Sequence, residues 1–425
     1  MDPINLVNSA LYCGGPSVPL HAWLAPGLAP ADLSNSWPQF HDRLVIGTYR
    51  GRTAVALACR LLGIGQGHEV LVPSYHCGSE IDALLHSGAR AVGYQVSREC
   101  KIDLQDLIAR RSSRTRAVYL IHYFGWEQPM QELRRWCDEE GLLLIEDCAL
   151  ALFSAGETGA IGLVGDAAIY SLPKTLGCCH GGLLSLPASR VSELSALAPA
   201  GLPVLLKEMR RGVQAAVLAG LEKVGLYGLA LSARRRRRRN GSVQEAVLEC
   251  PPMPPDYYFN PARDENRAVH PRVAAAAGFI GSATIVQKRR NNYERLAGAL
   301  DGIPGIQLLY SRLPDGVCPL SLPLLVSNRN GCVAALNSLG IEAFPWWAGF
   351  HRDAITWPEF PQACSLKHHL LTLPVHQGLD DRHLNHVART AQEVFRDTVG
   401  RAKTGPQSDR RIIPFVQSNS GLAAK

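Results

Sequence analysis

The 425-residue sequence has twelve cysteines but no CxxC pair, and it has no broad excess of charge of one sign. Without a CxxC pair or the cysteine spacing of a small disulfide-bonded domain, we expect neither a metal site nor a small disulfide framework. The run Arg234–Arg239 supplies six of the seven net positive charges, so the rest of the chain is close to neutral. Proteins that bind nucleic acid normally carry a spread basic face, so nucleic acid is not expected as a partner.

The first residues, MDPINLVNSALYCGG, do not combine a basic segment with an apolar core, and we expect no secretory signal. Several cysteines lie within apolar runs, where a reduced thiol packs as a small hydrophobic group. A reducing compartment, the cytoplasm, is therefore the expected location.

The composition is that of a folded globular protein, with 46% hydrophobic and 19% charged residues. Because 425 residues exceed what one core usually serves, we expect two domains. The predicted parts are an N-terminal arm at 1–44, a large domain at 45–255, a smaller domain at 256–400 and a tail at 401–425.

Short apolar runs alternate with helical stretches in the first half of the chain. A helix is expected over Thr53–Leu62. The expected strands are residues 70–73, 91–96, 116–122, 142–147, 167–172 and 182–186. Strands that are apolar along their whole length indicate a mostly parallel α/β sheet covered by helices on both faces. Ligands of such sheets bind at the carboxyl ends of the strands.

The expected second domain is an α+β unit that begins after the proline-rich PPMPP at 251–255. Its helical patterns predict one long helix over 272–300 and shorter helices over 331–340 and 382–394.

An apolar and arginine-rich insertion occupies about residues 203–241. Residues 213–233 are mostly apolar and are followed directly by Arg234–Arg239. One interpretation is a helix that lies on an anionic membrane, and the other is a helix and loop with a solvated charge run. Internal charges and glycines argue against a membrane-spanning segment.

Two chemically informative groups follow neighbouring strands. Glu146 and Asp147 end one strand, and Lys174 follows the next strand in a turn-rich stretch, SLPKTLG. A lysine can form a Schiff base with a carbonyl cofactor, and a carboxylate can hold a pyridine nitrogen protonated. Pyridoxal 5'-phosphate requires both groups.

The phosphate of that cofactor also needs hydrogen-bond donors. Gly51, Arg52 and Thr53 open a predicted helix, whose free N–H groups and dipole favour an anion. Ser171, three residues before Lys174, adds a hydroxyl group.

The segments TYRGRTAVALACRLLGIGQGHEVLVPSYHCGSEIDALLHSGA, YLIHYFGWEQPMQELRRWCDEEGLLLIEDCA, GDAAIYSLPKTLGCCHGGLL and RRNNYERLAGAL resemble the DegT/StrS pyridoxal-phosphate aminotransferases. The resemblance spans roughly residues 45–395. It implies a fold-type I homodimer with Lys174 as the Schiff-base lysine, Asp147 at the pyridine nitrogen, and Ser171 with Arg52 and Thr53 at the phosphate.

The resemblance also shows departures from the family pattern. Cys77 stands where many members place an aromatic ring on the cofactor, so Tyr75 or His76 compensates or the stacking is lost. Leu150 replaces a glutamine, and His180 replaces an acidic residue.

Five further residues are candidates for substrate contact. His122 ends a strand and could line the pocket, although a packed histidine is an equal alternative. Arg267 resembles the place from which the family sends polar residues into the neighbouring subunit. Trp346, Trp347 and His351 lie in FPWWAGFH and could close over a substrate or form domain-interface core.

Together these features predict a transaminase. The resemblance implies glutamate or glutamine as the amino donor and, as the acceptor, a keto group on a nucleotide-linked sugar or on a related polysaccharide or secondary-metabolite precursor. The alternative is a protein that keeps the fold for binding and docks to an anionic membrane or a partner enzyme through the apolar segment and Arg234–Arg239.

Overall fold

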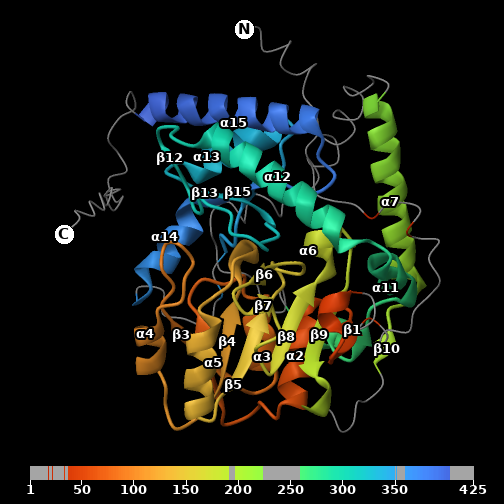
Figure 1. The fold of residues 1–425 in the computed structure, drawn as a ribbon, viewed down its shortest axis with the longest axis vertical. Coiled ribbons are helices and arrows are strands. Elements are labelled where there is room, and N and C mark those ends of the chain that lie inside the picture. Colours follow the sequence, from red (N-terminus) through yellow and green to blue (C-terminus); the bar gives the residue numbers. More distant parts are fainter. Residues whose placement is uncertain are drawn as a thin grey trace.

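The computed structural model describes residues 37–190, 197–223, 259–349, 351 and 359–402, together with Val18, Ala22 and Leu33. Most of the expected arm, the PPMPP segment, Arg234–Arg239 and the tail from residue 403 lie outside these residues. The described chain forms two layered units, one above the other in Figure 1. A large sheet and its helices make the lower unit, and a small sheet beneath three helices makes the upper one.

The large sheet has nine strands in the order β10-β11-β1-β9-β8-β5-β4-β2-β3. Their bounds are β1 Arg43–Thr48, β2 Glu69–Pro73, β3 Arg90–Tyr94, β4 Thr115–Ile121, β5 Leu143–Asp147, β8 Ala167–Ser171, β9 Gly182–Pro187, β10 Ala198–Pro199 and β11 Arg267–Ala268. The five strands from β3 to β8 are mutually parallel, whereas β9 is antiparallel to both β8 and β1. The predicted α/β sheet is therefore confirmed as mostly parallel.

Helices connect and cover these strands. They are α2 Gly51–Leu61, α3 Ser79–His86, α4 Leu104–Ala109, α5 Met130–Glu139, α6 Leu172–Leu176, α10 Pro261–Asp264 and α11 Pro271–Gly278. Alternate residues of β8 enter different cores: Ile169 packs with the cluster of α2 and α3, whereas Ala168 and Tyr170 pack with the cluster of α11. Both faces of the sheet are thus buried, which explains why its strands read as continuous apolar runs.

Strand β1 was not expected from the sequence, because its residues adjoin the irregular N-terminal stretch. It pairs over its full length with β9, from Arg43 opposite Pro187 to Thr48 opposite Gly182. This pairing brings the residues just before α2 beside the start of β9.

The upper unit contains the four-stranded sheet β12-β13-β15-β14, whose paired strands are antiparallel. The strands are β12 Ile306–Leu308, β13 Ser321–Val326, β14 Phe344–Pro345 and β15 Leu370–Pro374. The helices are α12 Ser282–Leu300, α13 Arg329–Ser338, α14 Pro361–His369 and α15 Asp381–Ala402. Residues of α12, α13 and α15 enclose one core with this sheet.

The expected single helix over 272–300 is wrong. Helix α11 ends at Gly278 and α12 begins at Ser282, after Gly281 in an extended conformation. Two glycines bracket the break, and glycine is a poor helix former. The Trp37 indole donates a hydrogen bond of 3.4 Å to the Ile280 carbonyl within the break.

Residues 261–278 belong with the large sheet, although the sequence assigned them to the second domain. β11 pairs with β1 and β10, and α11 packs under the same sheet edge. The part of the chain after the break forms the separate upper core.

Arg289 of α12 joins the two units. It is 1% exposed and donates hydrogen bonds to the carbonyls of Thr175, Pro319 and Leu320 and to the Gln377 amide oxygen. Burial lowers the pKa of this guanidinium. Thr175 belongs to α6, so the helix that carries Lys174 is bonded directly to the upper unit.

Helix α7, Leu202–Lys223, stands at one side of the molecule and contacts α11 (Figure 1). It covers the first part of the predicted insertion. Over the described residues, none of the helices is both long and apolar enough to cross a membrane.

Candidate active site

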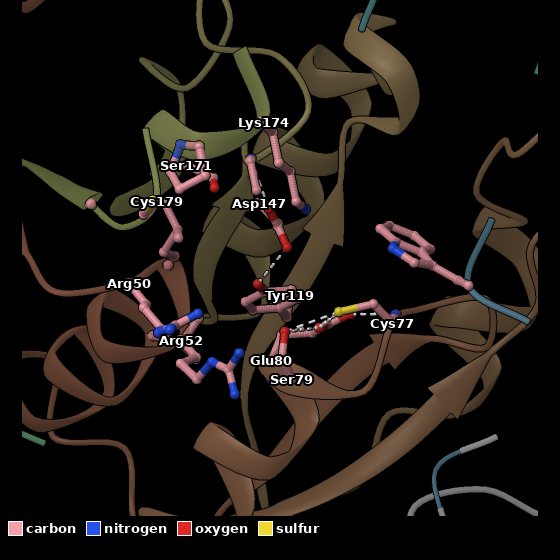
Figure 2. A pocket seen from close by; sticks show the side chains of 17 residues that line it. Arg50, Arg52, Cys77, Ser79, Glu80, Tyr119, Asp147, Ser171, Lys174 and Cys179 are labelled. Carbon is pink, nitrogen blue, oxygen red and sulfur yellow. Dashed lines mark hydrogen bonds between the residues drawn. The ribbon is translucent and has the colours of Figure 1, made fainter. Parts of the chain in front are cut away.

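A cavity of about 230 Å3 lies at the carboxyl ends of β5 and β8 (Figure 2). Seven of the residues singled out in the sequence line it: Gly51, Arg52, Cys77, Asp147, Ser171, Lys174 and Trp347. Lys174 and Asp147, 27 positions apart in the chain, therefore face the same space.

The adjacent acids Glu146 and Asp147 have different environments because successive side chains of a strand point to opposite faces. Asp147 lines the cavity, whereas Glu146 accepts backbone N–H bonds from Gly162 and Val164 at 3.1 and 3.0 Å. Glu146 thereby holds a loop, and Asp147 is the acid available for chemistry.

The Asp147 carboxylate is held at both oxygens. Oδ2 accepts a 2.8 Å hydrogen bond from the Tyr119 hydroxyl, and Oδ1 accepts one of 2.8 Å from the backbone N–H of Ala149. Burial raises the pKa of Asp147, while the positive charge of Lys174 and these hydrogen bonds lower it. A cationic ring nitrogen beside Asp147 would further favour its ionised form.

Lys174 lies on α6, a single turn that begins after β8 and ends at Gly177 in the left-handed conformation. Pro173 supports the first turn, where its missing N–H costs no helical hydrogen bond. The Lys174 ammonium lies 5.7 Å from the centre of the Trp347 ring. The short β8–α6–β9 connection thus fixes the amine at the cavity.

Gly182 lets β9 approach the N-terminus of α2. A Cβ at this position would lie 2.4 Å from the Arg50 carbonyl carbon and 2.5 Å from the Gly51 nitrogen. Any side chain would therefore displace the backbone that opens α2. This close approach explains why the second residue of the Gly181–Gly182 pair is a glycine.

The first residues of α2 and Ser171 line the cavity. The first N–H groups of a helix have no partner within the helix. Arg50 also lines the cavity, and its Nε has no hydrogen-bond partner among the described residues, although it lies 3.8 Å from Asp264 Oδ1. These donors suit a phosphate group.

The Thr53 side chain does not belong to this end of the cavity. Its hydroxyl donates a 2.8 Å hydrogen bond to the Asp264 carbonyl, and the residue lines a different pocket. Any contribution of Thr53 to a bound phosphate would come from its backbone, as the resemblance implies.

Cys77 lines the cavity beside two residues of α3. Its thiol lies 2.9 Å from Glu80 Oε2 and 2.9 Å from the Ser79 hydroxyl. Burial, with the neighbouring Glu80 carboxylate, raises the pKa of Cys77 to about 12. The thiol is therefore neutral and donates to Glu80.

Neither Tyr75 nor His76 lines the cavity. The Tyr75 hydroxyl donates to the Trp346 carbonyl at 2.8 Å, and His76 is fully buried. Of the aromatic residues that the structure describes, Tyr119 and Trp347 line the cavity. Tyr119 and Trp347 therefore offer aromatic rings to the cavity, although they lie at other positions in the chain than the aromatic residue of the family pattern.

His122 does not line the cavity. Gln128 donates its backbone N–H to His122 Nδ1 at 3.2 Å, so Nε2 carries the proton and donates to Glu146 at 2.9 Å. His122, Glu146 and Cys148 offer ligand atoms within 4.8 Å of one another, but Glu146 is already bonded by backbone N–H groups. His122 has the packed role given as the alternative.

Two other substrate candidates also lie away from this cavity. The Arg267 guanidinium lies 6.0 Å from the Tyr49 ring centre, and the His351 ring nitrogen Nε2 pairs with Asp82. Neither residue lines the cavity. His351 instead ties its loop to α3.

A second cavity of about 280 Å3 meets the first at Pro173 and Lys174. Trp346 and Ser321 line it, together with residues of β14 and β15. Within the described chain, neither the Ser321 hydroxyl nor the Trp346 indole nitrogen has a hydrogen-bond partner. Lys174 therefore lines both cavities.

The sequence did not single out several residues that shape the site. Lys367 of α14 is fully buried and donates to the carbonyls of His76, Trp347 and Gly349 at 3.1, 3.0 and 2.7 Å. It thereby positions the Trp347 loop from 20 residues away. Arg50, Ser79, Glu80, Tyr119 and Cys179 also line the cavity.

Some of these residues carried a detectable signal. Glu80 lies in the first turn of α3, seven residues after β2 ends, and Arg50 directly precedes the predicted helix. The other departures noted in the sequence have structural roles: Leu150 is 1% exposed, and His180 Nδ1 pairs with Glu208 of α7 at 2.9 Å.

Comparison with known proteins bears on the chemistry. Residues 36–198 match the DegT/DnrJ/EryC1/StrS aminotransferase family. A GDP-perosamine synthase of Vibrio cholerae is 34% identical over 137 residues, which are 32% of this chain and 37% of that protein. A dTDP-4-dehydro-2,3,6-trideoxy-D-glucose 4-aminotransferase of Saccharopolyspora spinosa is 26% identical over 81% of this chain and 82% of its own length.

The fold also has solved counterparts. A putative sugar aminotransferase of Streptococcus pneumoniae in its PMP form superposes with a TM-score of 0.65 at 14% identity. The match covers 93% of this chain and all of that one. The same protein has been solved in a PLP form.

Proposed function

Because the chain belongs to the DegT/DnrJ/EryC1/StrS aminotransferase family, we propose that it is a pyridoxal-phosphate-dependent aminotransferase. The observation that supports this most strongly is the shared cavity of Lys174 and Asp147. The proposed donor is glutamate or glutamine. The proposed acceptor is a keto group on a nucleotide-linked sugar, or on a related polysaccharide or secondary-metabolite precursor.

The residues that line the cavity fit this cofactor at three points. Lys174 would hold it covalently, Asp147 would face its ring nitrogen, and Ser171 with Arg50 and the N-terminus of α2 would hold its phosphate. When bound, the cofactor supplies a carbonyl carbon for exchange of amines and a ring that withdraws electrons.

Asp147 would keep a proton at the ring nitrogen. Its two hydrogen bonds fix the direction of the carboxylate, and its low exposure of 8% strengthens the electrostatic attraction to a cation. The Tyr119 hydroxyl would act only through Asp147, as a positioning group.

Lys174 would move the proton at the substrate carbon. Its amine lies at the junction of the two cavities, and α6 is held there through the Thr175 bonds to Arg289 and Gln377. A positioned amine can accept and return a proton within one active site.

The acceptor would occupy the second cavity. The Ser321 hydroxyl and the Trp346 indole N–H lack partners within the described chain, and an unpaired buried donor is unfavourable. Hydroxyl or carbonyl oxygens of a sugar would accept these bonds. This would place a keto carbon toward Lys174, which lines the same cavity.

We also propose a homodimer in a reducing cytoplasm. Fold-type I sites are completed by a second subunit, as the family resemblance implies. The ten cysteines in the described residues are all free thiols, in keeping with a reducing compartment. A binding protein without catalysis is the less favoured function, because such a protein has no need for the lysine and aspartate in one cavity.

The test is Lys174→Ala. The variant should show neither the visible absorbance of the covalently held cofactor nor amino transfer from glutamate or glutamine to a panel of keto sugars. Lys288→Ala, an exposed lysine of α12, is the matched control and should retain both properties. Full turnover by Lys174→Ala would overturn the proposed function.

A further inference from the structure

Trp347 has a backbone conformation that a bulky residue rarely adopts. Its φ angle is +46°, in the left-handed region, where a residue with a Cβ is strained. Across the described part of the chain, it is one of four non-glycine residues with a positive φ angle. Strain of this kind persists where the surrounding structure imposes it, and it is concentrated at sites that bind ligands.

The buried Lys367 ammonium holds the Trp347 backbone in this conformation. It donates hydrogen bonds of 3.0 Å to the Trp347 carbonyl and 2.7 Å to the Gly349 carbonyl. The same ammonium donates a 3.1 Å hydrogen bond to the carbonyl of His76, which directly precedes Cys77 in the chain. One cation therefore fixes the Trp347 loop against the segment that carries Cys77.

Two buried tyrosines support the Trp347 indole. The ring centres of Tyr75 and Trp347 are 5.4 Å apart, and those of Tyr123 and Trp347 are 5.8 Å apart. Both tyrosines are 0% exposed. Aromatic pairs at these separations attract one another. Because the backbone and the ring of Trp347 are already held, a ligand that contacts the indole would lose little free energy in ordering it.

The supported indole lies at the cavity that Lys174 and Asp147 share. Trp347 lines this cavity, and its ring centre lies 5.7 Å from the Lys174 ammonium. A cation within about 6 Å of an indole ring is attracted to it. Trp347 is only half-buried, so part of its surface stays open to a molecule bound at Lys174.

The neighbouring residues offer less surface for such a contact. Tyr119 also lines the cavity, but it is 0% exposed and its hydroxyl is bonded to Asp147. Cys77 has a small side chain, whose thiol donates to Glu80. Among the described residues of the cavity lining, Trp347 is therefore the aromatic residue with accessible surface.

We propose that the Trp347 indole packs against the ring of the bound cofactor and supplies an aromatic contact that Cys77 cannot. This inference rests on the proposed pyridoxal-phosphate site. A ring whose nitrogen stays protonated beside Asp147 is cationic, and tryptophan attracts a cation over its face more strongly than tyrosine or phenylalanine does. Since Trp347 lies between β14 and α14, the upper unit takes part directly in cofactor binding.

The experiment measures cofactor affinity without turnover. Cofactor-free, full-length protein is titrated with pyridoxal phosphate, and binding is followed by visible absorbance. Trp347→Leu keeps an apolar side chain but removes the ring, so the dissociation constant should rise at least about tenfold. Trp347→Phe keeps a ring and should raise it by less than about threefold.

Inorganic phosphate separates loss of the ring contact from a general distortion of the site. It shares the charge of the cofactor's phosphate group but has no ring to contact Trp347. Its dissociation constant, measured by competition with pyridoxal phosphate, should be the same in wild type and in Trp347→Leu. An equal loss of affinity for inorganic phosphate and for the cofactor would assign the effect to distortion and overturn the proposal.

Two further variants complete the comparison. Trp136 on α5 is half-buried and lines neither cavity, so Trp136→Leu is the matched tryptophan substitution and should bind the cofactor normally. Cys77→Ala removes the thiol and should weaken binding less than Trp347→Leu does. Thermal unfolding of the cofactor-free proteins checks that every variant is folded.

Three further outcomes would overturn the proposal. The first is wild-type cofactor affinity in Trp347→Leu, which would leave the proposed function in place without this contact. The second is a larger loss of affinity in Cys77→Ala than in Trp347→Leu, which would assign the contact to Cys77. The third is a wild-type protein that binds no pyridoxal phosphate, which would overturn the proposed function as well.

Discussion

The Tyr119 hydroxyl donates a 2.8 Å hydrogen bond to Asp147 Oδ2 across two neighbouring parallel strands. It orients the Asp147 carboxylate, which lines the same cavity as Lys174. Tyr119→Phe removes this bond and leaves the ring, so we expect a loss of roughly tenfold in kcat, equivalent to about 1.4 kcal/mol.

Asp147→Asn is the stronger companion change, with an expected loss of roughly a hundredfold or more. Both variants should still bind the cofactor covalently through Lys174, as followed by its visible absorbance. Equal losses in the two variants would contradict a positioning role for Tyr119.

Gly182→Ala should weaken cofactor binding. The new methyl group would lie 2.4 Å from the Arg50 carbonyl carbon and would displace the N-terminus of α2. We expect at least a tenfold rise in the dissociation constant of pyridoxal phosphate, measured by titration of the cofactor-free protein.

Gly298→Ala serves as the control for that glycine change. A Cβ there meets no atom within 4 Å, and the residue lies within α12. The control should bind cofactor normally and unfold at a slightly higher temperature, since alanine favours helix. Unchanged cofactor affinity in Gly182→Ala would contradict the close approach of β9 to α2.

Lys367→Met should destabilise the protein and disturb the Trp347 loop. The buried ammonium serves three carbonyls, and its loss leaves them unsatisfied at a cost of about 2–3 kcal/mol. Urea unfolding gives the stability, and tryptophan fluorescence reports the loop. Lys288→Met, at an exposed position of α12, should change neither quantity.

The Cys77 thiol should react slowly at neutral pH. Its pKa of about 12 leaves roughly one thiol in ten thousand ionised at pH 8. Alkylation of folded protein, followed by mass spectrometry, should speed up about tenfold per pH unit through pH 10. In urea the rate should level off above about pH 9, near the ordinary thiol pKa. A plateau near pH 8 in the folded protein would show that the thiol is not held neutral.

Ser321→Ala and Trp346→Phe should weaken acceptor binding. Each removes one donor from the second cavity, so KM for the keto acceptor should rise about fivefold to tenfold. The half-reaction with the amino donor alone, followed by cofactor absorbance, should keep its rate. Equal slowing of both half-reactions would place these residues outside an acceptor site.

The sequence predicted the elements whose signals are local. The strands β2, β3, β4, β5, β8 and β9 are short apolar runs, and the positions of Asp147 and Lys174 follow directly from the ends of β5 and β8. Parallel strands carry their carboxyl ends to one edge, so the shared cavity could be anticipated.

Features that depend on distant pairing could not be predicted. β1 is a strand because it pairs with β9, more than 130 residues away, and the 271–300 region breaks where Trp37 reaches the Ile280 carbonyl. Trp347 lies in the first cavity because Lys367 holds its carbonyl. These relationships arise from tertiary contacts that no local periodicity records.

The buried Arg289 bonds limit how the enzyme can move. The Arg289 guanidinium of α12 is bonded to the Thr175 carbonyl in α6 and to the Leu320 carbonyl just before β13. A rigid-body rotation of the upper unit away from the large sheet would therefore break several buried hydrogen bonds. Access for reactants should therefore be controlled by small loop displacements instead of by large opening of a hinge, and crystals should tolerate soaking with ligands.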